Sequence, residues 1–376
     1  MKIVIAPDSF KESMSALEVA HAIEKGFKKV FPLAEYIKVP MADGGEGTVQ
    51  SLVDATDGTI IKEVVTGPLG NPVEAFYGIS GDKQTAIIEM AAASGLELVP
   101  KEQRNPLLTT TKGTGELILA AINQGVKHII IGIGGSATND GGAGMAQALG
   151  VKLLDENGEE IGVGGGELSK LASIDLTQLD KRIEHITIEA ACDVNNPLTG
   201  EHGAAAVFGP QKGATKEMVA ILDQNLSHYA FILEKKCGRD IEKIPGSGAA
   251  GGLGAGLLAF LDAELKPGVD IVIETVQLAK QMEQATLVIT GEGRIDYQTI
   301  YGKTVIGVAK TAEKQGIPVI GIAGSLGDDC EIVYEHGIDA LFSITSGPVT
   351  LEDALENAEK YTEKLAENIA RTIKLF

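Results

Sequence analysis

The sequence contains no tryptophan and few other aromatic residues, with nine phenylalanines and seven tyrosines among its 376 residues. Proteins that bind single-stranded nucleic acids stack the bases on aromatic side chains, and this composition supplies few such platforms. Positive charge is also scarce, because 32 lysines and arginines stand against 52 aspartates and glutamates, for a net charge of −20. A surface this acidic repels nucleic acids and anionic lipids at long range, so we expect neither a nucleic-acid partner nor a membrane partner.

Cysteines and long apolar runs are scarce as well. Cys192, Cys237 and Cys330 are an odd number at wide spacings, which argues against a disulfide framework and against a thiolate metal site. The N-terminal apolar run ends at Pro7, too early for a signal peptide, and the longest later run, 251–261, is far shorter than a membrane span. We therefore expect a cytoplasmic protein whose thiols stay reduced.

Glycine, by contrast, is abundant, with 47 residues and no collagen-like period. Such a chain has many turns with positive φ or close backbone approaches, which often accompany phosphate-binding loops. Near both ends of the chain, short apolar runs that end in glycine or aspartate alternate with amphipathic stretches. The predicted strands there are 3–7, 36–40, 287–290, 319–323 and 340–344. The predicted helices are 17–30, a helix from Thr48, 305–315, a helix around 329–336 and a long helix over 351–374.

This alternation predicts a doubly wound parallel sheet of the Rossmann or flavodoxin type, with helices on both faces. The middle of the chain departs from it, because 59–65 and 73–79 alternate apolar and polar residues around a turn, as antiparallel strands do. We therefore expect an α/β protein of two domains, with the active site in the cleft between them. Residues 1–57 and 286–376 are expected to form the Rossmann-like domain, and 58–285 an inserted mixed α/β domain.

Polar side chains follow several of the predicted strands, at the edge of a parallel sheet where ligands bind. Such clusters follow the strands at 3–7, 36–40, 128–133 and 287–290. A turn or a helix cap explains any one of them, but four together favour a binding site. Carboxylates at these positions could hold Mg²⁺, which prefers oxygen ligands, or act as a general base. The carboxylates at predicted strand ends are Asp8, Asp43, Glu46, Asp140, Asp193, Glu292 and Asp296.

The segment 132–142 has the pattern G-x-G-x-x-A of a dinucleotide-binding loop. An anion cradle fits this segment better than a hydride-transfer site, because no acidic residue follows at the distance that a ribose requires. The usual ATP-binding loop is absent, since Tyr297 stands where G-x-x-x-x-G-K-T needs its first glycine. Neither a serine nucleophile elbow nor an H-E-x-x-H zinc motif occurs.

Taken together, these segments resemble the bacterial type-1 glycerate kinase family over essentially the whole chain. The motifs that carry the resemblance follow in order, namely 6–11 (APDSFK), 40–48 (PMADGGEGT), 132–142 (GIGGSATNDGG), 191–198 (ACDVNNPL), 208–213 (FGPQKG), 248–254 (GAAGGLG) and 289–296 (ITGEGRID). Two small departures are visible. Glu12 stands where the family often has glycine, and Val305 where proline commonly opens a helix.

The resemblance implies transfer of the γ-phosphoryl group of ATP to D-glycerate, with Mg²⁺, to give 2-phosphoglycerate in preference to the 3-isomer. It leaves the oligomeric state open, a homo-oligomer included. Within it we expect Asp193 to be the general base, with Asp43 as the second candidate and Lys11 as a further catalytic group. The expected glycerate-binding residues are Asp8, Ser9, Lys11, Asn195, Lys212 and Arg294. The expected nucleotide-binding residues are Gly134, Gly135, Ser136, Thr138, Asn139 and Gly141, and the expected magnesium ligands are Glu292 and Asp296.

Two other functions compete with this one. An NAD(P)-dependent oxidoreductase acting on a small hydroxy acid would use the G-x-G-x-x-A match. A non-catalytic protein that binds sugar acids would use the same cleft without phosphate loops. Turnover of a nicotinamide cofactor would identify the first function, and phosphoryl transfer from ATP in the presence of glycerate would exclude the second.

Overall fold

The computed structural model describes all 376 residues, which fall into two compact units. Unit 1 consists of Met1–Asp43, Gln50–Asp57 and Val269–Phe376, and unit 2 consists of Gly44–Val49 and Gly58–Gly268. Each unit has its own sheet and its own hydrophobic core. The protein therefore belongs to the α/β class that the sequence predicts.

The second crossing between the units lies at Gly268, earlier than the limit at 285 that the sequence suggests. The intervening helices are α9 (Gly268–Thr275) and α10 (Leu278–Gln281). Helix α9 packs so closely against α11 (Thr304–Glu313) that a Cβ at Gly307 would lie 2.5 Å from a methyl carbon of Val269. This packing groups α9 with unit 1, while the domain limits themselves stay a prediction.

The sheet of unit 1 has five strands, and each strand is parallel to its neighbours, which confirms the predicted parallel sheet. Its strand order is β13-β12-β11-β1-β2. Counted within the unit, this is the flavodoxin-like order 2-1-3-4-5, in which the chain changes direction between β1 and β11. The strands are β1 (Lys2–Ile5), β2 (Glu35–Lys38), β11 (Leu287–Ile295), β12 (Val319–Leu326) and β13 (Ala340–Ser343).

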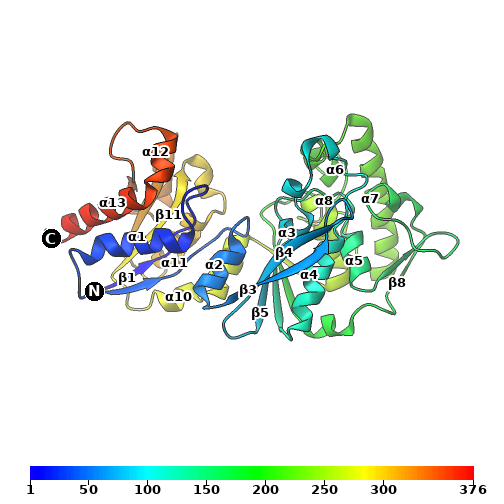
Figure 1. The fold of residues 1–376 in the computed structure, drawn as a ribbon, viewed down its shortest axis with the longest axis horizontal. Coiled ribbons are helices and arrows are strands. Elements are labelled where there is room, and N and C mark those ends of the chain that lie inside the picture. Colours follow the sequence, from blue (N-terminus) through cyan, green and yellow to red (C-terminus); the bar gives the residue numbers. More distant parts are fainter. The chain divides into compact units, whose positions relative to one another are not determined.

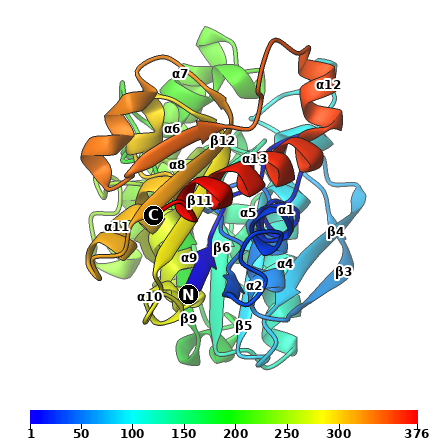
Figure 2. The same cartoon turned by 90° about the vertical axis from the view of Figure 1, so that its left-hand side faces the viewer.

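Helices cover both faces of this sheet (Figures 1 and 2). Helices α1 (Ala16–Lys28) and α13 (Ala358–Ile373), from opposite ends of the chain, lie side by side on one face (Figure 1). Phe27 of α1 and Ile369 of α13 join the same buried cluster as the strand residues beneath them. Helix α11 lies on the opposite side of β11 from α1 (Figure 2). The doubly wound arrangement is thereby confirmed.

The single long helix predicted for 351–374 is wrong in one respect, because it breaks at Asn357 into α12 (Leu351–Glu356) and α13. The side-chain amide of Asn357 donates to the carbonyl and carboxylate oxygens of Asp353, at 3.4 and 3.1 Å. Asparagine side chains compete in this way for the carbonyl groups of the preceding turn, which disfavours a helix interior. The backbone N–H of Asn357 also donates to the Asp353 carbonyl at 3.0 Å, so the break is a local one at this residue.

The sheet of unit 2 is mixed, with six strands in the order β10-β9-β6-β5-β4-β3. Strands β3 and β4 pair antiparallel along their length, which confirms the predicted hairpin, and β4 also pairs antiparallel with β5. From β5 to β10 all neighbours are parallel. The strands are β3 (Thr59–Thr66), β4 (Pro72–Ile79), β5 (Thr85–Glu89), β6 (His128–Gly132), β9 (Thr187–Ala191) and β10 (Glu264–Lys266), and β7 (Lys152–Leu154) pairs separately with β8 (Ser173–Asp175).

The helices of unit 2 pack on this sheet around one core, and the segment 107–150, hard to place from the sequence, lies in this unit. The α-helices are α3 (Ala91–Ser94), α4 (Lys112–Asn123), α5 (Ala143–Ala148), α6 (Ala204–Phe208), α7 (Lys216–Cys237) and α8 (Ala249–Leu261), while α2 (Thr48–Ala55) begins in unit 2 and continues in unit 1. The 3₁₀ helices of the protein are η1 (Leu96–Leu98), η2 (Lys101–Gln103), η3 (Glu167–Lys170), η4 (Lys181–His185), η5 (Pro210–Lys212), η6 (Tyr297–Ile300) and η7 (Cys330–His336), the last in place of the predicted helix around 329–336.

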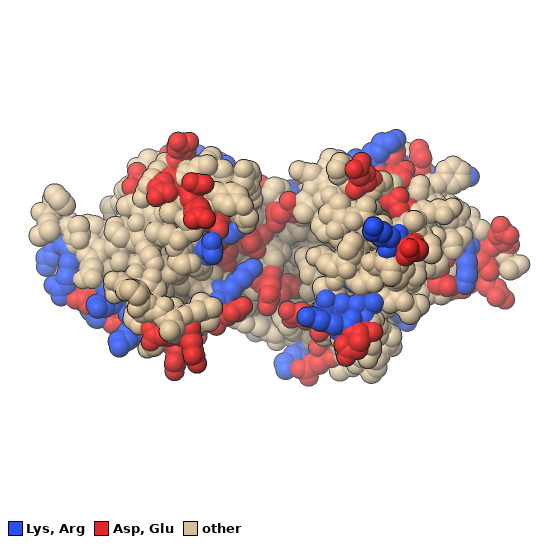
Figure 3. Space-filling view, turned by 90° about the horizontal axis from the view of Figure 1, so that it is seen from above, with Lys and Arg blue, Asp and Glu red and all other residues tan.

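The helices bear on membrane insertion, and the surface bears on the distribution of charge. None of the helices combines the length and the apolar character that crossing a membrane requires. On the face drawn in Figure 3, lysine and arginine side chains lie among aspartates and glutamates and form no extended basic area. This distribution agrees with the net charge of −20.

Candidate functional site

The strands β1 and β11 are neighbours at the point where the sheet of unit 1 changes direction. In flavodoxin-like sheets, ligands bind beyond the carboxyl ends of the strands at this point. The chain that leaves β1 stays beside β11, because the amide N–H of Asp8 donates to the carbonyl of Gly291 at 2.8 Å. Asp8 and Glu292 therefore both lie at this switch point.

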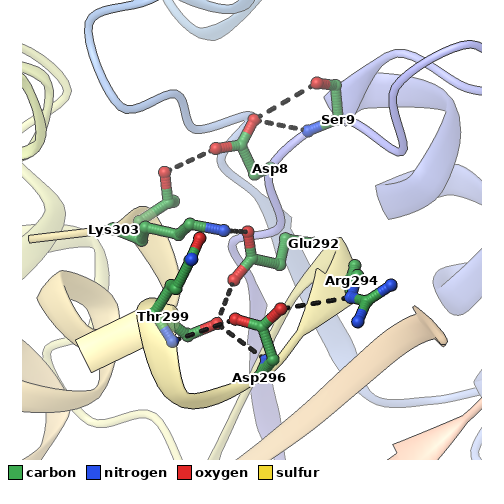
Figure 4. Close-up of polar contacts among 9 residues, drawn as sticks. Asp8, Ser9, Glu292, Arg294, Asp296, Thr299 and Lys303 are labelled. Atoms are coloured by element: carbon green, nitrogen blue, oxygen red, sulfur yellow. Dashed lines mark hydrogen bonds and ion pairs between the residues drawn. The ribbon is translucent and has the colours of Figure 1, made fainter. Parts of the chain in front are cut away.

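Asp8 is half-buried, and its carboxylate is held by donors on both oxygens (Figure 4). Thr304 Oγ1 donates to Oδ2 at 2.6 Å, and the amide N–H of Ser9 donates to Oδ1 at 2.6 Å. Burial raises the pKa of Asp8 to about 6; the two hydrogen bonds oppose this shift, whereas the charges of Asp43 and Glu292 add to it. A carboxyl group that titrates near neutrality at a strand end is typical of acid–base sites.

Glu292 is the second carboxylate at the switch point, and it is held by a cation and a hydroxyl group (Figure 4). Lys303 Nζ donates to Oε2 at 2.9 Å, and Thr299 Oγ1 donates to Oε1 at 2.8 Å. Burial raises the pKa of Glu292, the interactions with Lys303 and Thr299 lower it, and the charge of Asp43 raises it further. The side chain of Lys303 remains 34% exposed, so its ammonium group is accessible to a ligand.

Asp296, the other predicted magnesium ligand, caps the 3₁₀ helix η6. Its Oδ1 accepts the amide N–H of Gln298 at 2.9 Å, and its Oδ2 accepts Nε of Arg294 at 3.1 Å. Both carboxylate oxygens thus already have donors. Arg294, in contrast, is 65% exposed and offers its remaining N–H groups to an anion.

The loop after β1 carries Ser9 and Lys11. The side chain of Lys11 is exposed and forms neither a hydrogen bond nor an ion pair within the protein. The next residue, Glu12, has a φ of +64°, a conformation that favours glycine and so accounts for the glycine that the family often has here. Val305 is near the N-terminal end of α11, where proline is equally acceptable because the first amide groups need no helical partner.

The glycine-rich loop after β6, in unit 2, has an exposed tip and a buried base. Gly134 and Gly135 are exposed, and a Cβ at Gly134 would meet no atom within 4 Å. Gly135 has a φ of +72°, which side chains rarely adopt. Ser136 follows and is 6% exposed. The other three predicted nucleotide-binding residues lie in the buried base of the loop, namely Thr138, Asn139 and Gly141.

Asp140 lies fully buried in this loop and organises its backbone. Its carboxylate accepts amide N–H groups of Thr111, Gly142 and Gly144 at 2.8, 3.2 and 3.3 Å, and the hydroxyl of Thr111 at 2.9 Å. Burial raises the pKa of Asp140, and these hydrogen bonds lower it. The amide groups at the start of α5 therefore bind the protein's own carboxylate and are not offered to a phosphate.

Lys212, at the end of η5, lies behind the same loop. Its Nζ donates to Ser136 Oγ at 2.8 Å and to the carbonyl of Thr138 at 2.7 Å. Burial lowers the pKa of Lys212 to about 7, against the opposing effect of the charge on Asp140. With 1% of its surface exposed, Lys212 has no direct access to a ligand, whereas the sequence predicts it to bind glycerate.

The loop after β9 carries Asp193 and Asn195, and both side chains are exposed. Asp193 Oδ1 accepts the amide N–H of Gly268 at 3.0 Å, which ties this loop to the segment where unit 2 ends. Asn195 forms no hydrogen bond within the protein and is available to a ligand. Asp193 therefore has a structural contact in addition to its predicted catalytic role.

Thr299, Thr304 and Glu89 were not predicted from the sequence, and the sequence left Lys303 open between a phosphate contact and a solvated lysine. Lys303 and Thr304 belong to a G-K-T ending that lacks the first glycine of an ATP loop, and Thr299 follows no motif. Glu89, at the end of β5, accepts the amide N–H of Val49 at 2.9 Å and so binds the start of α2. The G-K-T triplet was the one available signal, whereas a carboxylate at a strand end gives no sign of which amide it will bind.

Magnesium is the ion that the predicted reaction requires. No group of three or more histidine, cysteine, aspartate or glutamate side chains is close enough together to hold a metal ion by itself. Mg²⁺ in phosphoryl-transfer enzymes usually has one or two carboxylates and completes its shell with phosphates and water. The carboxylates at the switch point fit that use, because the charge of Asp43 raises the pKa of both Asp8 and Glu292, and a cation relieves such repulsion.

Comparison with known proteins gives one consistent result. The sequence model of the glycerate kinase family matches residues 3–374. A protein of Bacillus subtilis named glycerate kinase is 65% identical over 100% of this chain and 98% of its own length. A protein of Escherichia coli named glycerate 2-kinase is 59% identical over the same shares of the two chains. A crystal structure from Salmonella typhimurium LT2, described as glycerate kinase 2, superposes with a TM-score of 0.93 at 58% identity, covering 100% of this chain and 98% of that one. This chain belongs to the glycerate kinase family of enzymes.

Proposed function

We propose that this protein phosphorylates D-glycerate with ATP and Mg²⁺ and that it transfers the γ-phosphoryl group to the 2-hydroxyl, giving 2-phosphoglycerate. Family membership supports the reaction class, and the name of the Escherichia coli relative supports the position of transfer. The observation that carries the proposal is the cluster at the switch point of unit 1, where Asp8, Glu292 and Lys303 combine acid–base groups with an accessible cation.

Removal of the proton from the substrate hydroxyl requires a general base. We assign this role to Asp43 ahead of Asp193, which reverses the order that the sequence suggests. Asp43 is close enough to Asp8 and Glu292 for its charge to raise the pKa of both, so it belongs to the same cluster. Asp193 lies in the loop after β9 of unit 2, where its Oδ1 accepts the amide N–H of Gly268, and it is not among the main charges that shift the pKa of Asp8 or Glu292.

Glycerate carries a carboxylate, and an acidic protein must neutralise that charge locally. Lys11 and Arg294 are the best candidates, because the first is unpaired and the second is 65% exposed. Ser9 in unit 1, whose hydroxyl reaches Asp8 Oδ1 at 3.3 Å, and Asn195 in unit 2 each stay a predicted contact of a substrate hydroxyl. Asp8 remains a candidate to orient a hydroxyl, since its two oxygens accept Thr304 and Ser9 and retain lone pairs.

The nucleotide phosphates are assigned to the exposed tip of the loop after β6, at Gly134 and Gly135, with the buried Ser136 directly after it. A tip without Cβ atoms lets an anion approach the backbone amide groups closely. The buried Thr138, Asn139 and Gly141 shape this loop from within. A second candidate for the phosphates is the segment Gly302 to Thr304 in unit 1, which Lys303 favours.

Mg²⁺ would neutralise charge on the nucleotide phosphates and on the transferred group. Glu292 is the preferred ligand among the two predicted ones, because it lies at the switch point and the charge of Asp43 acts on it, whereas Asp296 caps η6. Localisation in the cytoplasm and assembly into a homo-oligomer stay predictions from the sequence.

The experiment that tests the proposal is ³¹P NMR of the products formed from ATP, Mg²⁺ and D-glycerate. We expect the resonance of 2-phosphoglycerate to grow with that of ADP. Formation of 3-phosphoglycerate would keep the reaction class and move the attacked hydroxyl. Absence of any phosphoglycerate would remove the proposal, and nicotinamide turnover with a hydroxy acid in the same preparation would replace it with an oxidoreductase.

A further inference from the structure

Lys212 is the one lysine or arginine of the protein whose side chain is buried, at 1% exposure. It ends the 3₁₀ helix η5 and is followed by Gly213, whose φ is +92°. A Cβ at Gly213 would lie 2.4 Å from the carbonyl oxygen of Arg104, so the backbone packs closely against that residue on one side. A cation is buried at this cost only where it performs a specific task.

The contacts of Lys212 define that task. Its ammonium group donates to Ser136 Oγ at 2.8 Å and to the Thr138 carbonyl at 2.7 Å, so it spans the base of the loop after β6. An ammonium group can only donate hydrogen bonds, so Ser136 Oγ must act as the acceptor. The hydroxyl hydrogen of Ser136 is thereby left for another acceptor, next to the exposed Gly134 and Gly135.

We propose that Lys212 is a positioning residue that acts through Ser136, fixing its hydroxyl so that the hydrogen is donated to an oxyanion of the bound nucleotide. This inference rests on the proposed function and deepens it, because it replaces direct binding of glycerate by Lys212 with indirect binding of a phosphate. Lys212 contributes orientation and charge from behind the loop, while Ser136 makes the contact. Hydrogen bonds assisted by a neighbouring charge are stronger than neutral ones.

Electrostatics adds a dependence on pH. Burial lowers the pKa of Lys212 to about 7, and the buried Asp140 raises it. Arg104, whose guanidinium donates to the carbonyl of Gln211 at 3.5 Å, is a further charged group beside η5. An anion at Ser136 stabilises the protonated form of Lys212, so nucleotide affinity should fall as the pH rises above 7.

The test is a double-mutant cycle on nucleotide binding. The variants are Ser136→Ala, Lys212→Met and the double variant, with Lys216→Met and Ser169→Ala as matched controls at exposed positions. We expect each single substitution in the loop to raise the KM for ATP about tenfold, the usual effect of losing a charge-assisted hydrogen bond. The double variant should be little worse than the singles, the KM for glycerate should stay unchanged, and both controls should behave as the wild-type protein.

Three outcomes would overturn the inference while leaving the proposed function intact. These are effects of the two substitutions that multiply in the double variant, an increase in the KM for glycerate alone, and a KM for ATP that does not change. A wild-type protein that forms no phosphoglycerate would instead contradict the proposed function itself. The two failures are therefore distinguishable in one set of assays.

A second measurement covers the case in which Lys212→Met does not fold. The affinity of the wild-type protein for Mg²⁺ and a non-hydrolysable ATP analogue is compared with that of Ser136→Ala between pH 6 and pH 8.5. Titration of the nucleotide itself is common to both proteins and cancels in the comparison. We expect the wild-type affinity to fall more steeply with pH than that of the variant, and parallel curves would contradict the coupling between Lys212 and Ser136.

Discussion

Two regions of the molecule differ in the groups that they offer to a ligand. One is the polar cluster at the ends of β1 and β11 in unit 1, and the other is the glycine-rich loop after β6 in unit 2. The first is built from side chains that pair with one another and remain partly accessible, as Lys303 does with Glu292. The second is built from backbone, and its charged residues, Asp140 and Lys212, are buried. The comparison separates a region suited to chemistry from a region suited to holding an anion.

Sheet topology explains the difference. In unit 1 the chain changes direction between β1 and β11, and in sheets of this kind ligands bind beyond the strand ends at such a point. In unit 2 the parallel strands β5, β6, β9 and β10 lie in the order of the chain, so no such reversal occurs among them. The loop after β6 lies at no such change of direction. Its exposed glycines, followed by a serine, are suited to binding an anion through the backbone.

The largest effect is expected for substitution of Asp43, the proposed general base. Asp43→Asn should lower turnover by about 10²–10⁴, the usual contribution of a general base, while nucleotide affinity stays unchanged. Asp193→Asn is the matched variant and should lower turnover less than tenfold, because Asp193 serves the amide of Gly268. Steady-state kinetics with both substrates checks this pair. A larger loss for Asp193→Asn would return the role of base to the loop after β9.

The next effect concerns the tip of the loop in unit 2. Gly134→Val should raise the KM for ATP by about tenfold or more, equivalent to about 1.4 kcal/mol, with no change in melting temperature. A Cβ at Gly134 meets no atom of the protein, so only the ligand is obstructed. Gly347→Val is the control, because Gly347 is equally open. Gly135→Val differs, since its φ of +72° should make the variant about 1–3 kcal/mol less stable.

An unchanged KM for ATP in Gly134→Val, with normal stability, would place the phosphates elsewhere. The G-K-T segment around Lys303 would then be tested with Lys303→Met. This result would contradict the contrast between the two regions, because both substrates would then bind to unit 1.

The carboxyl group of Asp8 predicts how stability depends on pH. Its folded pKa of about 6 exceeds the ordinary value of 3.8, so the fold disfavours the ionised form. That penalty is fully present above pH 6, decreases as the pH falls through 6, and is absent below about pH 4. Asp8→Asn should therefore raise stability by about 1–2 kcal/mol at pH 8 and by nothing at pH 4, as urea unfolding at both pH values can measure. Equal effects at both pH values would contradict this assignment.

The smallest effect separates the two carboxylates that were predicted to bind magnesium. Asp296→Ala should lower stability by about 1 kcal/mol through loss of the η6 cap and leave the apparent KM for Mg²⁺ unchanged. Glu292→Gln should instead raise the apparent KM for Mg²⁺. Assays at saturating ATP with varied Mg²⁺ distinguish the two variants, and a reversed pattern would make Asp296 the ligand.

Much of the fold was predictable because hydrophobic periodicity is a local property. The five parallel strands of unit 1 and the β3–β4 hairpin follow from runs and alternations that can be read directly in the sequence. The break at Asn357 was missed because the apolar positions of α12 and α13 stay in register across it. The side chain of Asn357 binds the carboxylate of Asp353 there, a local contact that the pattern of apolar residues does not reveal.

The contacts of the site residues were less predictable, because the sequence does not indicate which group a polar residue at a strand end will bind. Asp296 was predicted to bind magnesium, which stays a prediction, but its hydrogen bonds with Gln298 and Arg294 could not be foreseen. Lys212 was predicted to bind glycerate, and its side chain is buried. Partner choice depends on tertiary packing, which spacing along the chain does not encode.

The division of labour between the two regions is tested most directly by isothermal titration of a non-hydrolysable ATP analogue with Mg²⁺ into three proteins. These are the wild-type protein, Gly134→Val and Asp43→Asn, each confirmed to be folded. The account predicts that Asp43→Asn binds the nucleotide as the wild-type protein does and that Gly134→Val binds it at least about tenfold more weakly. Wild-type affinity in Gly134→Val together with weakened binding in Asp43→Asn would contradict it.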